Sequence, residues 1–173
     1  MRLANSGPWA LRELDLAVLP QGKKPIRVLH ISDIHFAPGQ RKKAKFLRDL
    51  AELSPDLVVN TGDNLGHRGA INAVLNALGP LSKFPGVFVN GSNDYRHPSF
   101  RNPVKYIFKP SEPDGFRDID TERFTRELEN HGWLNLNNQS GKLEVNGTKL
   151  GFFGLDDPHS HPWRIWLADR SLW

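Results

Sequence analysis

The chain has 173 residues, of which 38% are hydrophobic and 24% are charged, a balance that fits one folded domain and lies outside the range of disordered proteins. It contains no cysteine, which excludes disulfide bonds, zinc-thiolate sites and thiol nucleophiles. Any metal ion must therefore bind to His, Asp, Asn or similar side chains. The formal net charge of +4 helps to attract anions, phosphates included, but selects no particular partner.

The N-terminal residues lack the apolar stretch of a signal peptide, and no run approaches the ~20 apolar residues of a membrane-spanning helix. We therefore expect a cytoplasmic protein without a membrane span. Basic residues are scattered apart from one group, Arg41, Lys42, Lys43 and Lys45, which is typical of a solvated helix face. The sequence thus does not favour a nucleic-acid partner.

The first two thirds of the chain alternate strand-like and helix-like segments. Residues 9–19 mix apolar and polar positions and predict an edge strand. The runs at residues 26–34, 56–63 and 85–94 each begin as a buried strand and end in a polar loop. Residues 40–53 and 68–78, which lie between these runs, carry apolar side chains at helical spacing. This alternation predicts an α/β fold with a parallel sheet, whose polar loops all lie at one edge.

The remainder of the chain predicts a long loop, one helix and several strands. Residues 95–118 are rich in Pro, Arg and Asp, and we expect them to form a loop that overhangs the polar edge. Thr121 is the predicted N-cap of a helix that runs to about His131 and ends at Gly132. The following segments predict antiparallel strands that extend the sheet, with a hairpin turn at Asn146 and Gly147.

Three polar segments carry the candidate chemistry: Asp33-Ile34-His35, Gly62-Asp63-Asn64 and Gly91-Ser92-Asn93-Asp94. An Asp and a His two residues apart at a strand end can offer a carboxylate and an imidazole to one ion. A second carboxylate, Asp63, could bridge two ions, and an Asn amide oxygen from the third segment could bind the second ion. The three segments together therefore predict a two-metal site.

Each of these residues also has a simpler interpretation. Asp33 or Asp63 alone would more often be a turn or helix-capping residue, and His35 alone would more often be a surface histidine. The joint pattern favours metal binding. His67 and His97 follow two of the candidate loops and are weaker candidates for substrate contacts. Asp156, with Asp157, Pro158 and His159, lies either near the site or in an ordinary turn.

The segments LHISDIHF, VVNTGDNL and FVNGSNDY resemble the first three sequence blocks of the calcineurin-like metallophosphoesterase family. The further segments DNLGH, GSNDY and GLDDPH resemble an actinobacterial-type subgroup of predicted phosphohydrolases, so that the resemblance covers about residues 9–159. It implies a sandwich with a parallel or mixed sheet and flanking helices. It also implies that Asp33, His35 and Asp63 bind metal ions.

The third block departs from the family pattern. Ser92 stands where the family has a ligand Asn, and Asn93 stands where it often has a His that assists the leaving group. Either Ser92 is a poor ligand or the loop is shifted by one residue and Asn93 binds the metal. We prefer the shift, because an Asn amide offers a carbonyl oxygen. Asp94 is then expected to orient the loop beside the reacting groups, with His97 as a candidate substrate contact.

The resemblance implies a metallophosphoesterase that hydrolyses small phosphate mono- or diesters by means of a hydroxide activated by two divalent ions, namely Mn, Fe or Zn. The family's later G-H-x-H block is absent, and three of the five tryptophans fall in the last 11 residues. We therefore expect residues 1–159 to be the N-terminal part of such a domain, apparently truncated, and residues 160–173 to be an atypical tail. The alternative function is an inactive remnant that at most binds metal or phosphate.

Overall fold

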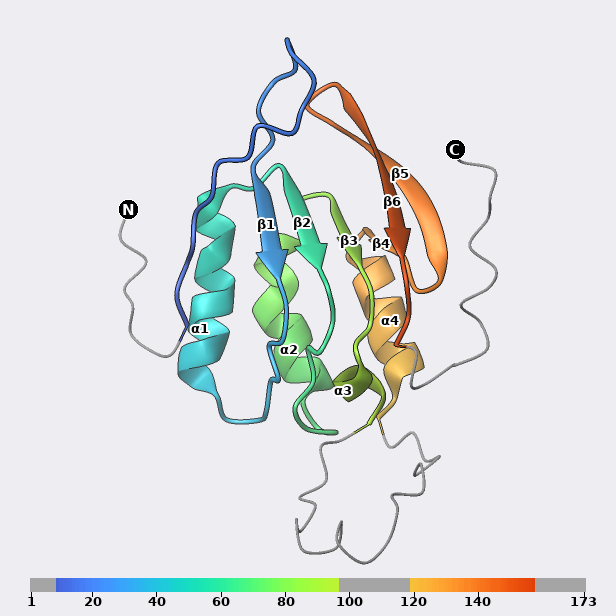
Figure 1. Cartoon of the computed structure of the whole chain (residues 1–173). Helices are drawn as coiled ribbons and strands as arrows, with labels where there is room; N and C mark the ends of the chain where they lie inside the picture. Colours follow the sequence, from blue (N-terminus) through green and yellow to red (C-terminus); the bar gives the residue numbers. More distant parts are fainter. Residues whose placement is uncertain (1–8, 97–118, 158–173) are drawn as a thin grey trace, which may run out of the picture.

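Four short strands form a parallel sheet in a computed structural model of the chain, which describes residues 9–96 and 119–157. The strands are β1 (Val28–Ile31), β2 (Leu57–Asn60), β3 (Gly86–Phe88) and β4 (Trp133–Asn135). They lie in the order β1-β2-β3-β4, and each neighbouring pair is parallel. Each successive strand is therefore added to the same side of the sheet. All the polar loops that follow strands end up at its lower edge in Figure 1.

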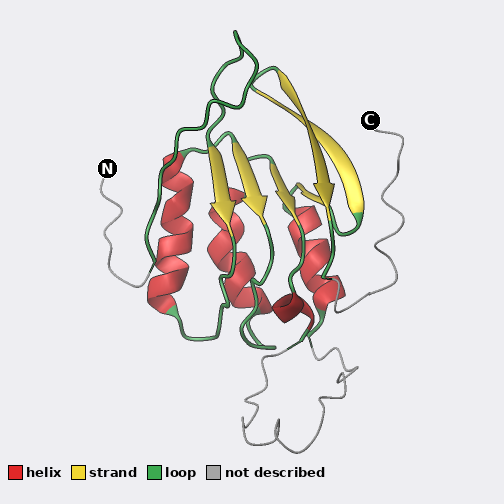
Figure 2. Ribbon diagram, in the orientation of Figure 1, coloured by secondary structure: helices red, strands yellow, loops and turns green. Residues whose placement is uncertain are grey.

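The helices lie side by side along one face of this sheet, as Figures 1 and 2 show. They are α1 (Arg41–Asp49) with the short 3-10 helix η1 (Leu50–Leu53), α2 (Ile71–Leu78) with η2 (Gly79–Leu81), and α4 (Thr121–Asn130). Right-handed crossovers that all move the same way along a sheet must place their helices on the same face. The core lies between these helices and the sheet, where Val58, Val74 and Phe124 are fully buried. The predicted α/β class is confirmed.

A β-hairpin covers part of the opposite face of the sheet (Figure 1). It consists of β5 (Gln139–Val145) and β6 (Thr148–Gly154), which pair only with each other. The turn residues Asn146 and Gly147 have φ angles of 51° and 74°, the left-handed pair that a tight two-residue hairpin needs. A side chain on Gly141 would meet Leu134 of β4, so the absence of one lets the hairpin pack closely on the sheet.

Three predictions of local structure are wrong. Residues 9–19 form no strand. The strands after residue 132 do not extend the sheet as an antiparallel continuation, because β4 is parallel to β3 and the hairpin is a separate sheet. The N-cap of α4 is Asp120, whose side chain accepts a hydrogen bond from the Arg123 N–H at 3.1 Å. The hydroxyl of Thr121 instead donates to the carbonyl of Asp94 at 2.6 Å.

The helices at residues 40–53 and 68–78 lie where they were predicted, and Gly132 ends α4 with a φ of +86°. Most of the predicted loop at 95–118, including His97, lies outside the described residues, as does His159. No helix in the two described ranges is long and apolar enough to span a membrane.

Candidate metal centre

The loops after β1 and β2 run beside each other beyond the ends of the strands. The Asp33 N–H donates to the carbonyl of Gly62 at 3.0 Å, and the His35 N–H donates to the carbonyl of Asp63 at 2.9 Å. A further parallel bridge joins Phe36 and Leu65. These backbone bonds fix the two loops in register, so that Asp33, His35 and Asp63 come from adjacent positions at the polar edge.

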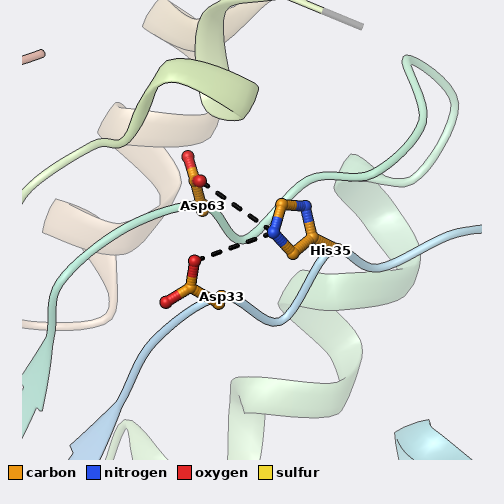
Figure 3. Close-up of side chains that lie close together, drawn as sticks. All are labelled: Asp33, His35 and Asp63. Carbon is orange, nitrogen blue, oxygen red and sulfur yellow. Dashed lines mark ion pairs between the residues drawn. The ribbon is translucent and has the colours of Figure 1, made fainter. Parts of the chain in front are cut away.

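The side chains of these three residues converge (Figure 3). Nε2 of His35 lies 3.7 Å from Oδ1 of Asp33 and 3.9 Å from Oδ2 of Asp63. One ligand atom from each residue lies within 4.8 Å of the other two. The His35 separations are too long for hydrogen bonds. Two atoms bound about 2.1 Å from one ion can lie up to about 4.2 Å apart, so both separations fit ligands of a shared cation.

All three residues have a left-handed backbone conformation, with φ angles of 53° for Asp33, 43° for His35 and 54° for Asp63. This region is uncommon for residues other than glycine and costs about 1–3 kcal/mol at each position. Such strain persists only where the surrounding contacts enforce it, and it tends to cluster at functional sites. Of the six described residues other than glycine with positive φ, three are these clustered residues, and the other three are Ser54, Asn138 and Asn146.

The third loop reaches the centre through α3 (Ser92–Tyr95), a single helical turn. Both nitrogens of Asn93 donate to Asp63, the backbone N–H to Oδ1 and the side-chain amide to Oδ2, each at 2.9 Å. The Ser92 side chain is exposed. Close approach depends on Gly91, because a Cβ there would lie 2.6 Å from the backbone nitrogen of Asp63. The structure thus brings Asn93 rather than Ser92 against the carboxylate of Asp63.

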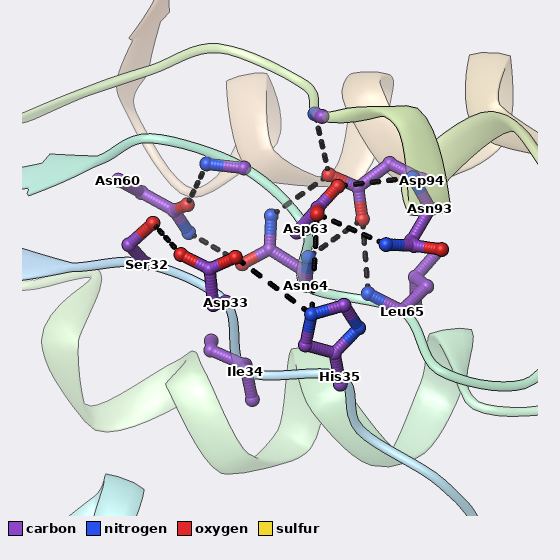
Figure 4. A network of polar contacts seen from close by, with 12 residues as sticks. Ser32, Asp33, Ile34, His35, Asn60, Asp63, Asn64, Leu65, Asn93 and Asp94 are labelled. Carbon is purple, nitrogen blue, oxygen red and sulfur yellow. Dashed lines mark hydrogen bonds and ion pairs between the residues drawn. The ribbon is translucent and has the colours of Figure 1, made fainter.

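Asp94 lies behind Asp63 and ties the second and third loops together (Figure 4). Its Oδ1 accepts the backbone N–H groups of Asn64 at 2.8 Å and Leu65 at 2.9 Å. Its Oδ2 accepts the N–H of Gly91 at 3.0 Å and the side-chain amide of Asn64 at 3.2 Å. Burial raises the pKa of Asp94 to about 6, while these donors act in the opposite direction. The group is therefore mainly ionised at neutral pH and organises the loops as an acceptor.

Lys43 of α1 holds the first loop from the other side. Its ammonium group donates to the carbonyl of Ile34 at 2.7 Å and to that of His35 at 3.3 Å. The ammonium also lies 5.6 Å from the centre of the Trp9 ring, within cation-π range. Partial burial lowers the pKa of Lys43. The interpretation of the basic group on α1 as entirely solvated is therefore wrong for Lys43.

We expect Lys43→Met to lower the free energy of unfolding by about 1–2 kcal/mol, because it removes two charge-assisted hydrogen bonds from a strained loop. Urea unfolding in EDTA measures this change. Lys42→Met is the matched control, since Lys42 is exposed on the same helix and the charge change is identical. An equal loss in both variants would show that Lys43 does not brace the loop.

The weaker candidates lie elsewhere. Nδ1 of His67 accepts the N–H of Gly69 at 3.0 Å, and His67 is not one of the three clustered residues. Asp156 is buried and accepts a hydrogen bond from the Tyr95 hydroxyl. It too is outside the cluster. Sequence reasoning overlooked Tyr95 and Lys43, because a tyrosine beside a motif and a lysine within a basic run carry no distinctive pattern.

Comparison with known proteins agrees with this arrangement. The sequence profile of the calcineurin-like phosphoesterases matches residues 26–172. The chain belongs to this family of metal-dependent phosphoesterase hydrolases. This calcineurin-like chain is also similar to the uncharacterized metallophosphoesterase YkoQ of Bacillus subtilis (strain 168), with 26% identity over 158 residues. The aligned region covers 89% of this chain and 51% of YkoQ, so the chain spans about half the length of this relative.

Proposed function

We propose that the chain hydrolyses phosphate esters with the help of divalent metal ions, one of which binds to Asp33, His35 and Asp63. The convergence of two carboxylates and one imidazole within 4.8 Å carries this proposal. The donor set consists of oxygen and nitrogen atoms without thiolate, which suits Mn, Fe or Zn.

The residues present suit a role for Asp63 between two ions. Its carboxylate faces His35 on one side and Asn93 on the other. Asn93 presents its amide nitrogen to Asp63, so a second ion would require the amide to turn and offer its oxygen. Divalent ions bound here would supply an activated water molecule and neutralise phosphate oxygens. Asp94 holds the Asn64 and Gly91 backbones in place and keeps the two loops together.

The substrate class that the family implies is supported by the exposure of the cluster and by the charge of the chain. The side chains of Asp33 and His35 are 67% and 42% exposed, so that a phosphate group can approach them directly from solvent. The net positive charge of the chain favours encounter with anionic substrates. We therefore propose a small phosphate mono- or diester as the substrate.

Activity assays test this proposal. The purified chain, stripped with EDTA and supplied with manganese, is expected to hydrolyse bis-p-nitrophenyl phosphate or p-nitrophenyl phosphate. Asp33→Asn is expected to lower the rate about 100-fold, the cost of about 1 Å of misplacement in an active site. Asp49→Asn on α1 is the control with the same charge change, because Asp49 pairs with Lys45 away from the loops. Manganese-independent turnover, or equal rates in both variants, would contradict the proposal.

A second function is binding of metal or phosphate without turnover. Among the described residues, only one group of three His, Asp or Glu side chains suited to a metal ion is found, and Asn93 faces Asp63 with its amide nitrogen rather than its oxygen. A site with one ion would lack the second cation that clamps the attacking and leaving oxygens. Manganese binding in calorimetry, combined with no turnover of either substrate, would favour this function over hydrolysis.

A further inference from the structure

A buried carboxylate from the end of the hairpin meets the helix that carries Asn93. The Tyr95 hydroxyl donates to Oδ1 of Asp156 at 2.6 Å. This distance is typical of a hydroxyl bonded to an ionised carboxylate, which is among the stronger hydrogen bonds in proteins. Tyr95 is 4% exposed and Asp156 is 8% exposed, so water competes little for this contact.

Asp156 is itself fixed by its neighbours. Its Oδ1 accepts the N–H of Asp157 at 2.8 Å, and its own N–H donates to the side chain of Asn138 at 3.1 Å. Asn138 precedes β5 and Asp156 follows β6, so that both ends of the hairpin contribute. Asp156 is therefore tied to the base of the hairpin by its backbone bond to Asn138.

The other end of the contact is a single helical turn, α3. A turn this short has little stability of its own and depends on its anchors. Three successive residues supply them: Asn93 bonds to Asp63, Asp94 bonds to the Asn64 and Leu65 backbones, and Tyr95 bonds to Asp156. The first two anchors lie on the metal-centre side. The Tyr95 bond is the anchor that comes from the hairpin.

We propose that Asp156 is a positioning residue, which acts through the Tyr95 hydroxyl to hold α3 so that Asn93 stays against Asp63. The hairpin thereby stabilises a loop of the metal centre that it does not itself enter. The effect on metal binding rests on the proposed function, whereas the effect on the placement of Asn93 does not.

Two measurements on the full chain test this inference. The first is the hydrogen exchange rate of the Asn93 backbone N–H, which is bonded to Asp63, relative to that of Val58 in the core. The second is manganese affinity by calorimetry. Tyr95→Phe is expected to speed the Asn93 exchange about tenfold with little change at Val58, and to weaken manganese binding about tenfold, as for other residues that orient ligands.

The choice of variants separates positioning from general loss of stability. Asp156→Ala also removes the bond from the Asp157 N–H, so it should lose at least as much as Tyr95→Phe. The double variant should lose less than the sum of the two single variants, because both remove the bond between Tyr95 and Asp156. Asp156→Asn keeps an oxygen that can accept from Tyr95 and should lose less than Asp156→Ala. Ser82→Ala is the control, since it removes a hydrogen bond from the Gly79 carbonyl far from α3 and should leave Asn93 unchanged.

Unchanged exchange at Asn93 in Tyr95→Phe would overturn the inference. Faster exchange with unchanged manganese affinity would also overturn it, because the placement of Asn93 would then not matter to the metal. If the unmodified chain binds no manganese at all, the proposed function fails, and the exchange rates alone still decide whether Asp156 holds Asn93 in place.

Discussion

Asp63→Asn is expected to weaken manganese binding by about 100-fold or more, the largest loss among single changes at the metal centre. Residues that only orient ligands typically cost 10–100-fold when replaced, and a carboxylate that binds the ion directly should reach at least the upper end of that range. Asp63 is expected to contribute more to manganese affinity than Asp33 or His35 does, because its carboxylate faces both His35 and Asn93. Titration calorimetry with manganese measures the change.

Asn93→Ala provides the comparison within the site. Under the proposed two-ion arrangement, this variant removes one neutral ligand, whereas Asp63→Asn removes a negative charge shared between the ions, so Asn93→Ala should cost less. Asp49→Asn serves as the control outside the site, because it makes the same charge change on α1. Equal losses in Asp63→Asn and Asn93→Ala would mean that Asp63 does not bridge two ions.

The parallel core of the fold was predictable because its local signals agree with one another. The strand at β2 is apolar on both faces, the helix at α1 has one apolar side, and the polar residues follow at the strand ends. Because neighbouring strands are parallel, their carboxyl ends share a single edge, at which Asp33 and Asp63 can meet. The proximity of the candidate ligands follows from topology, although their roles as ligands remain predictions.

The errors arose where tertiary contacts outweighed local patterns. Thr121 suits an N-cap by residue type, but its hydroxyl is taken by the carbonyl of Asp94, and Asp120 caps α4 instead. The segment after α4 looked like a continuation of the sheet, yet the tight turn at Asn146 pairs β5 with β6 alone. No short-range signal could have revealed that Lys43 contacts the loop at His35, eight residues earlier.

The left-handed conformations at Asp33, His35 and Asp63 could not be predicted from the sequence either. Asp and His adopt this region more often than most residues other than glycine, but residue type alone does not predict it at a given position. The backbone bonds between the two loops enforce these angles. Strain of this kind is a property of the assembled site.

Asp94 should give the metal-free protein an unusual dependence of stability on pH. Burial raises its pKa from 3.8 to about 6 in the folded chain. The folded state therefore holds the proton more tightly than the unfolded state does. Its contribution to the free energy of unfolding is fully present below pH 3.8 and is lost as pH rises to about 6. At about 1.4 kcal/mol per pKa unit, the loss is ~3 kcal/mol.

Denaturant unfolding in EDTA between pH 4 and pH 7 measures this contribution as the difference between the natural chain and Asp94→Asn. The variant is less stable throughout, because its amide NH₂ must face an N–H donor such as Gly91 or Asn64. Its disadvantage should shrink as pH rises from 4 to 7, because the natural chain loses the contribution of Asp94 over this range. A disadvantage of Asp94→Asn that instead grows with pH would contradict this prediction. It would mean that the four N–H donors around Asp94 affect its pKa more strongly than burial does. The loops that Asp94 joins would then stabilise the negative charge, and the carboxylate would be ionised well below pH 6.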